Sequence, residues 1–286
     1  MRMKKGIAFF SLACVLFALM TLPGCAQRTA RRDAKGLFSW RALSEGNGDA
    51  LLELAQSQNI TELYQDCSQN SEAELADFLQ KLDGAGIAAY WLTGDPSWGG
   101  DPEGGEMLRQ IGRAAALRDA AGGALRGIVF DVEPYLLPEW EDDADTLMQS
   151  FVSAARCAYR EASRQGMEMI LCVPYFYDTK GLGEALEQLI ASGCDRVAVM
   201  NYYRGKESEH IASEAALAQK HGRGIINIYE LKAPGEHGLV EENTYHSEGL
   251  DALAENFGSL CADYPELEIS LALHDAQALE EVLAGE

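Results

Sequence analysis

Short apolar runs alternate with amphipathic helical patterns along this chain from residue 36 onward. Strands that are buried on both faces read as nearly continuous apolar stretches, so we interpret these runs as the strands of a parallel sheet. The expected strands are Gly36–Trp40, Ile60–Tyr64, Ile87–Leu92, Leu125–Val132, Glu168–Pro174, Arg196–Asn201, Gly224–Tyr229 and Leu267–Leu273.

The segments between these strands repeat apolar residues at helical spacing. The longest of them covers residues 145–165, and a last helical piece covers residues 277–283. Ser71 followed by Glu74 is a capping-box pattern, which marks the start of a helix. Several of the expected helices end at a glycine just before the next strand, as helices commonly do.

The order of these elements predicts the fold. Eight strands that alternate with helices over about 250 residues are typical of a (β/α)₈ TIM barrel, and we expect residues 36–286 to form it as a single domain. An open, doubly wound sheet is the alternative, but it usually has fewer strands and leaves the last two units unexplained. No glycine-rich phosphate loop follows the first strand, so we expect no nucleotide cofactor.

The N-terminus has the layout of a secretory signal. Basic residues precede an apolar stretch over residues 7–22 that is short for a membrane span. It ends in Leu-Pro-Gly-Cys25, which resembles the lipobox of bacterial lipoproteins. That resemblance implies removal of residues 1–24, lipidation of Cys25, and anchoring on the extracytoplasmic face of the cell membrane. Residues 25–35 would form a basic tether next to the membrane.

The net charge and the cysteine positions narrow the classes of ligand that the protein could bind. Residues 1–24 contain three basic residues and no acid, so their removal changes the net charge from −22 to −25. A chain this acidic disfavours nucleic acid and anionic partners. Beyond Cys14 and Cys25 five cysteines remain, and none forms a metal-binding spacing. The histidines are scattered as well, so we expect no metal site.

The most informative motif follows the fourth expected strand. Asp131 and Glu133 are two residues apart, so their side chains point to the same face. Active sites of TIM barrels are built at the carboxyl ends of the strands. Acids buried at such a place are either paired or poised for chemistry. We therefore expect a catalytic role, although the two acids could also mark the point where the strand reaches water.

The carboxyl ends of the other strands supply the expected substrate contacts. By this interpretation all four tryptophans of the chain lie at one end of the barrel. Aromatic faces beside carboxylates suit sugar rings, so we expect a carbohydrate substrate or ligand. For Asp95 a turn role and for His274 a rim position are alternatives. The candidate substrate-binding residues are Trp40, Trp91, Asp95, Tyr135, Tyr175, Asn201, Tyr202 and His274.

The fourth strand also carries a family resemblance. Its sequence through Glu133 resembles the end of the D-x-x-D-x-D-x-E signature of family 18 glycoside hydrolases, the chitinase-like group. Asp131 and Glu133 match the last two acids of that signature. Arg126 and Val129 stand where its two earlier acids would be.

A second motif supports this resemblance. Met200-Asn201-Tyr202-Tyr203 resembles the family's M-x-Y-D/N motif, with Tyr203 in place of the acid or amide. The resemblance implies that Glu133 is a general acid and that Asp131 orients it or stabilises the intermediate. It further implies that the N-acetyl group of the substrate is the nucleophile.

A different retaining scheme fits the same strand. Glu133-Pro134 resembles the Asn-Glu-Pro of other barrel glycosidases, with Val132 in place of the asparagine. Glu230, at the end of the seventh strand, would then be the nucleophile. The two carboxyl groups would have to lie about 5–5.5 Å apart. Both schemes stay open at the level of the sequence.

Two functions follow from these observations. The first is a membrane-anchored extracellular glycoside hydrolase that acts on a cell-wall or environmental glycan. The second is a lipoprotein that binds glycans or peptidoglycan on the same barrel without cleaving them. The departures from the family motifs favour the second, as would a salt bridge from Arg126 or Arg204 that blocks Glu133.

Overall fold

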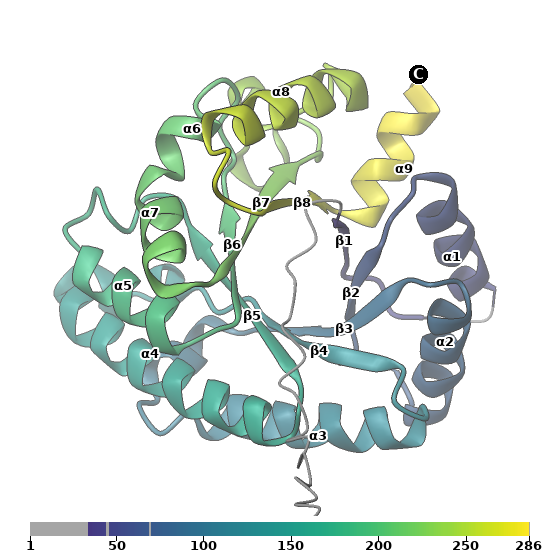
Figure 1. Ribbon diagram of the computed structural model, residues 1–286, viewed down its shortest axis with the longest axis horizontal. Helices are drawn as coiled ribbons and strands as arrows, with labels where there is room; N and C mark the ends of the chain where they lie inside the picture. Colours follow the sequence, from purple (N-terminus) through teal and green to yellow (C-terminus); the bar gives the residue numbers. More distant parts are fainter. Residues whose placement is uncertain (1–33, 44–45, 69, 286) are drawn as a thin grey trace, which may run out of the picture.

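The computed structural model describes residues 34–43, 46–68 and 70–285. Eight parallel strands pair in chain order, and β8 pairs with β1 to close the barrel. Figure 1 looks along this barrel, with the helices outside the ring of strands. The (β/α)₈ prediction is confirmed. The strands are β1 (Lys35–Ser39), β2 (Glu62–Asp66), β3 (Ala88–Thr93), β4 (Leu125–Phe130), β5 (Glu168–Pro174), β6 (Arg196–Met200), β7 (Gly224–Glu230) and β8 (Ile269–His274).

Helices follow every strand and cover the outside of the barrel. Within the described residues no helix is long and apolar enough to cross a membrane. The predicted signal peptide and Cys25 lie outside the described residues. The helices are α1 (Asn47–Ser57), α2 (Glu72–Gly84), α3 (Gly105–Ala120), α4 (Glu139–Arg164), α5 (Gly183–Ser192), α6 (Glu207–His210), α7 (Ala212–His221), α8 (Gly249–Asp263) and α9 (Ala276–Gly285), with short 3₁₀ turns η1 (Pro96–Gly100), η2 (Pro134–Leu136), η3 (Glu236–Gly238) and η4 (Glu241–Asn243).

The start of α2 is where the capping-box pattern predicted a helix start. The Ser71 hydroxyl accepts a hydrogen bond from the Glu74 amide and Glu74 reaches back to the Ser71 amide, so the predicted capping box forms. The expected strand Leu125–Val132 ends earlier, at Phe130. Asp131 and Glu133 therefore stand just beyond β4, in the connection to η2, and not within the strand.

Side chains of the strands fill two separate layers. Alternate residues point into the barrel, where an apolar cluster includes Phe38, Leu92, Val129 and Ile228. The intervening residues point outward and pack under the helices in a larger cluster. This alternation decides which residue at the end of each strand faces the barrel axis.

A buried ion-pair network fills the amino end of the barrel interior. The Arg196 Nε atom lies 2.6 Å from a Glu168 oxygen, and its Nη1 atom lies 2.9 Å from a Glu62 oxygen. The Tyr90 hydroxyl donates to Glu168 and accepts from Arg196, both at 2.9 Å. The Tyr64 hydroxyl donates to Glu62 at 2.7 Å. This end is therefore closed by side chains that satisfy one another.

Candidate active site

The backbone around Asp131 is held tightly against β3. The Asp131 amide donates to the Thr93 carbonyl at 2.9 Å, which continues the ladder between β3 and β4 by one residue. A Cβ atom on Gly94 would lie 1.8 Å from the Asp131 carbonyl oxygen. Only glycine therefore permits this approach, and it fixes where the Asp131 side chain starts.

Asp131 has an unusual environment for a carboxyl group. Its Oδ1 atom is buried and has no hydrogen-bond partner within the described residues. Val129, one pleat earlier on the same face, is fully buried and offers no polar group. Burial, and then the charge of Glu133, raise the pKa of Asp131 to about 7, against the lowering effects of the Cys172 thiol and of Lys232. Asp131 can therefore hold a proton near neutral pH.

Glu133 is partly exposed, and its hydrogen-bond partner is a tyrosine. The Tyr135 hydroxyl donates to the Glu133 Oε1 atom, in the place where we expected Asp131. Arg204 pairs with Glu248, and Arg126 is exposed. Within the described residues no salt bridge blocks Glu133, so the arrangement that would favour binding alone is absent there.

Tyr202, two residues after the end of β6, lies near the two acids. Its side chain is half-buried and packs against the interior cluster. Burial, and then the negative charges of Glu230 and Asp131, raise the pKa of the Tyr202 hydroxyl well above its usual range. The hydroxyl thus stays protonated and can donate a hydrogen bond beside the acids.

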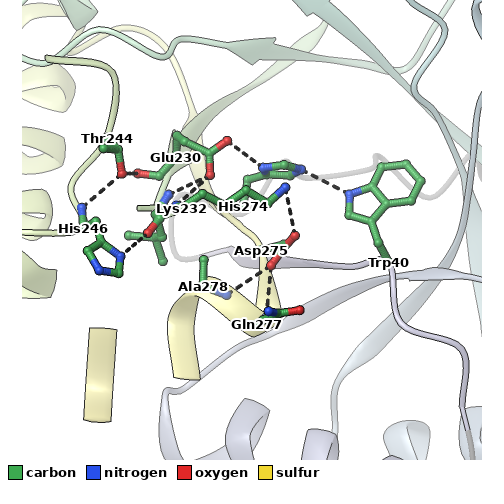
Figure 2. A network of polar contacts seen from close by, with 10 residues as sticks. Trp40, Glu230, Lys232, Thr244, His246, His274, Asp275, Gln277 and Ala278 are labelled. Carbon is green, nitrogen blue, oxygen red and sulfur yellow. Dashed lines mark hydrogen bonds and ion pairs between the residues drawn. The ribbon is translucent and has the colours of Figure 1, made fainter. Parts of the chain in front are cut away.

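Glu230 at the end of β7, His274 at the end of β8 and Trp40 directly after β1 form a hydrogen-bonded row, shown in Figure 2. Glu230 Oε1 accepts from the amides of Leu231 and Lys232 at 3.0 and 2.9 Å. Glu230 Oε2 lies 2.9 Å from His274 Nδ1, and Trp40 Nε1 lies 3.1 Å from His274 Nε2. Both carboxylate oxygens of the buried Glu230 are therefore engaged.

The structure places Trp91 away from these residues. It is only 2% exposed and belongs to the outer layer, with the Arg113 guanidinium 5.1 Å from its ring centre. Tyr90 and Leu92, its neighbours on β3, point into the barrel, so Trp91 must point outward. Trp98 and Trp140 also pack against the outer layer. The four tryptophans therefore do not form the expected cluster, and of the four only Trp40 packs against the interior layer of the barrel.

Asp95 and Asn201 have structural partners. Asp95 is exposed and caps η1, accepting from the Ser97 amide at 2.9 Å. Asn201 is buried, and its amide nitrogen donates to Asn227 Oδ1 at 2.9 Å on the outer side of the sheet. Asp95 therefore has the turn role considered as its alternative, and Asn201 faces away from the acids.

Tyr175 lies at the same end of the barrel but contacts a different group. Its ring stacks on His210, with the ring centres 4.2 Å apart and the planes 6° from parallel.

Seven of the site residues predicted from the sequence lie together at the carboxyl end of the barrel. They are Trp40, Asp131, Glu133, Tyr135, Tyr202, Glu230 and His274.

Two residues of the site were missed by the sequence prediction. Cys172 lies on the interior face of β5 and is buried next to Asp131. Lys232 lies two residues after Glu230, and its ammonium group pairs with Asp275 at 3.2 Å. Counting alternate residues along β5 could have found Cys172.

Among the described residues no three His, Cys, Asp or Glu side chains are grouped so that they could hold a metal ion.

Comparison with solved structures supports the fold. A GH18 chitinase variant from Cycas revoluta in complex with (GlcNAc)4 superposes with a TM-score of 0.58 at 14% identity, covering 88% of this chain and 98% of that chain. The same plant's GH18 chitinase in complex with (GlcNAc)3 gives 0.56 at 15% identity, with the same coverage. A 3-keto-D-glucoside 4-epimerase from E. coli gives 0.51 at 15% identity and covers the same shares.

Comparisons of sequence give no assignment. No family model matches the chain. No curated protein matches it either. At these identities the structural likeness concerns the barrel, which chitinases and a sugar epimerase share. Any function must therefore be argued from the side chains at the carboxyl end of the barrel.

Proposed function

We propose that this protein is a glycoside hydrolase that acts on a glycan of N-acetylated amino sugars, with Glu133 as the general acid. The observation that carries the proposal is the Asp131–Glu133 pair. Asp131 has a buried oxygen without a partner, and Glu133 is partly exposed beside it with a hydrogen bond from Tyr135. A buried carboxyl oxygen without a partner is costly to a fold, and such groups are typical of catalytic sites.

In this mechanism Glu133 protonates the glycosidic oxygen as the bond to the anomeric carbon breaks. Positioned general acids contribute about 10²–10⁴-fold to such a step. Burial and the charge of Glu133 raise the pKa of Asp131 to about 7, so Asp131 can hold a proton beside Glu133 near neutral pH. The protonated Tyr202 hydroxyl can donate a hydrogen bond to an oxygen of the sugar at the same place.

The contacts of Glu230 favour one of the two retaining schemes. Its oxygens accept from two backbone amides and face His274, and its side chain is only 3% exposed. A carboxylate held in this way is poorly placed to attack a sugar. The acetamido oxygen of the substrate is then the nucleophile, which attacks the anomeric carbon while Glu133 gives its proton to the leaving oxygen.

Location outside the cytoplasm belongs to the same proposal. The N-terminal signal and Cys25 would tether the barrel to the cell membrane, where it would meet cell-wall or environmental glycans. Replacing Cys25 with serine should move the protein from the membrane fraction to the soluble fraction. Persistence of the Cys25→Ser protein in the membrane fraction would contradict the anchor.

The test of the activity uses the full chain in detergent with (GlcNAc)4 as the substrate. We expect cleavage by the wild type and a loss of kcat of about 10²–10⁴-fold in Glu133→Gln. Glu53→Gln, the same chemical change on the exposed face of α1, is the control and should cleave at the wild-type rate. Equal rates for wild type and Glu133→Gln would exclude the mechanism. Binding of (GlcNAc)4 without cleavage by the wild type would favour a glycan-binding protein.

A further inference from the structure

We propose that Glu230 and His274 are positioning residues that hold the Trp40 indole and the Tyr202 ring as the aromatic walls of the sugar site. In this arrangement His274 is neutral and carries its proton on Nδ1. The inference rests on the proposed function, because it assigns the substrate-contacting faces of that same site. It gives Glu230 a role other than that of a nucleophile.

The hydrogen-bond chemistry of the row fixes the state of His274. An indole N–H can only donate, so His274 Nε2, 3.1 Å from Trp40 Nε1, must accept. The proton of a neutral imidazole then sits on Nδ1 and is donated to Glu230 Oε2 at 2.9 Å. The other tautomer, or a doubly protonated ring, would place two N–H groups against each other at Trp40.

The row is anchored by backbone groups that cannot rotate away. Two main-chain amides hold the second oxygen of Glu230. Beyond His274 the chain continues into Asp275, which pairs with Lys232 at 3.2 Å and accepts from the Gln277 amide at 3.0 Å at the start of α9. Figure 2 shows His274 between Glu230 and Trp40, with Asp275 and Lys232 beside it. The acceptor offered to Trp40 is thus fixed in place.

Two aromatic rings take their orientation from His274. Trp40 is held through its Nε1 atom, and Tyr202 stacks on the imidazole with ring centres 5.9 Å apart and planes 26° from parallel. Both rings are half-buried and pack on the interior cluster, and the charges of Asp131 and Glu133 act on Tyr202. Sugars stack on aromatic faces, and a face that is held before binding costs less entropy when the ligand arrives.

The first test reads the tautomer directly, without substrate. In a protein labelled with ¹⁵N on histidine, at about pH 8, we expect His274 Nδ1 to be protonated and Nε2 to be free. The His274→Gln spectrum identifies the signals of this residue. A proton on Nε2, or on both nitrogens, would overturn the proposal whether or not the protein cleaves glycans.

The second test separates positioning from chemistry. For (GlcNAc)4 we expect His274→Ala and Glu230→Gln to raise KM about tenfold, with kcat within about twofold of the wild type. His274→Gln keeps an acceptor near the Nε2 position and should recover most of the KM. A collapse of kcat in Glu230→Gln, with KM unchanged, would make Glu230 a nucleophile and overturn the positioning role.

Trp40→Phe keeps the proposal testable if a His274 variant fails to fold. It removes the indole N–H and retains an aromatic ring, so we expect a similar rise in KM and no further rise when it is combined with His274→Ala. Independent, multiplying effects of the two changes would contradict the coupling. If the wild type neither binds nor cleaves (GlcNAc)4, the proposed function fails. The tautomer measurement then still shows whether His274 accepts from Trp40 and donates to Glu230.

Discussion

The two ends of the barrel interior both contain carboxylates, but the partners of these carboxylates differ between the ends. At the amino end Glu62 and Glu168 share Arg196 and accept from two tyrosine hydroxyls. At the carboxyl end Asp131 has a buried oxygen without a partner, and Glu133 accepts from a tyrosine. The cost of burying charge is offset at the amino end, whereas at the carboxyl end one buried oxygen of Asp131 has no such compensation.

This difference separates structural acids from candidate catalytic acids within the same fold. Arg196 belongs to the interior and serves the acids beside it. At the carboxyl end the ammonium group of Lys232, which lowers the pKa of Asp131, is already paired with Asp275. A fold keeps an uncompensated acid only where something other than stability selects it, which is why the carboxyl end is the candidate site.

Removing Arg196 tests the amino end and should have the largest effect on stability. Arg196→Met leaves two buried carboxylates facing each other, which typically costs about 3–5 kcal/mol. Urea unfolding should show this loss, and the activity per folded molecule should change little. The triple change R196M/E62Q/E168Q removes the charges together and should restore most of the stability. A Met variant as stable as the wild type would mean that the network does not hold this end.

The pH dependence of stability tests the carboxyl end. Because the pKa of Asp131 is raised in the folded state to about 7, the folded protein holds this proton after the unfolded chain has lost it. The contribution of this bound proton to the free energy of unfolding is complete below about pH 4. It is lost as pH rises through about 7, and the loss is about 1–3 kcal/mol. Asp131→Asn should not show it. We therefore expect the variant to gain stability relative to wild type between about pH 4 and pH 8 in urea unfolding.

The comparison also shows what the sequence could predict. Apolar runs such as Arg196–Met200 are signals that lie within one element, and all eight strands were found in this way. Asp131 and Glu133 could be chosen as candidates because their spacing and their place after an apolar run are also local. Trp91 was misplaced because we counted positions near the end of β3 without following the alternation of faces along the strand.

The rest of the site depends on contacts between distant parts of the chain. Trp40 and His274 are 234 residues apart, and the closure of β8 on β1 brings them together. Whether Glu230 is a free nucleophile or a hydrogen-bonded support depends on its side-chain conformation. The spacing of residues along the sequence does not determine that conformation. The amino-end network left a signal that we did not use, since Glu168 and Arg196 are charged residues at the starts of apolar strands.

Removing one tyrosine hydroxyl at each end gives the smallest effects and the most closely matched comparison. Tyr90→Phe deletes a group that donates to Glu168 and accepts from Arg196, so we expect a loss of about 1–2 kcal/mol in urea unfolding and an unchanged kcat. Tyr135→Phe deletes the donor to the partly exposed Glu133, where water can replace it. We expect a stability change below about 0.5 kcal/mol but a severalfold lower kcat on (GlcNAc)4.

The two phenylalanine variants contradict the division between the ends if they behave alike. An activity loss in Tyr90→Phe at full folding would mean that the amino-end network acts on the site. A stability loss in Tyr135→Phe as large as that of Tyr90→Phe, with kcat unchanged, would mean that the hydroxyl on Glu133 supports the fold. The pair of acids at the carboxyl end would then be structural as well, because the group that orients Glu133 would serve packing and not proton transfer.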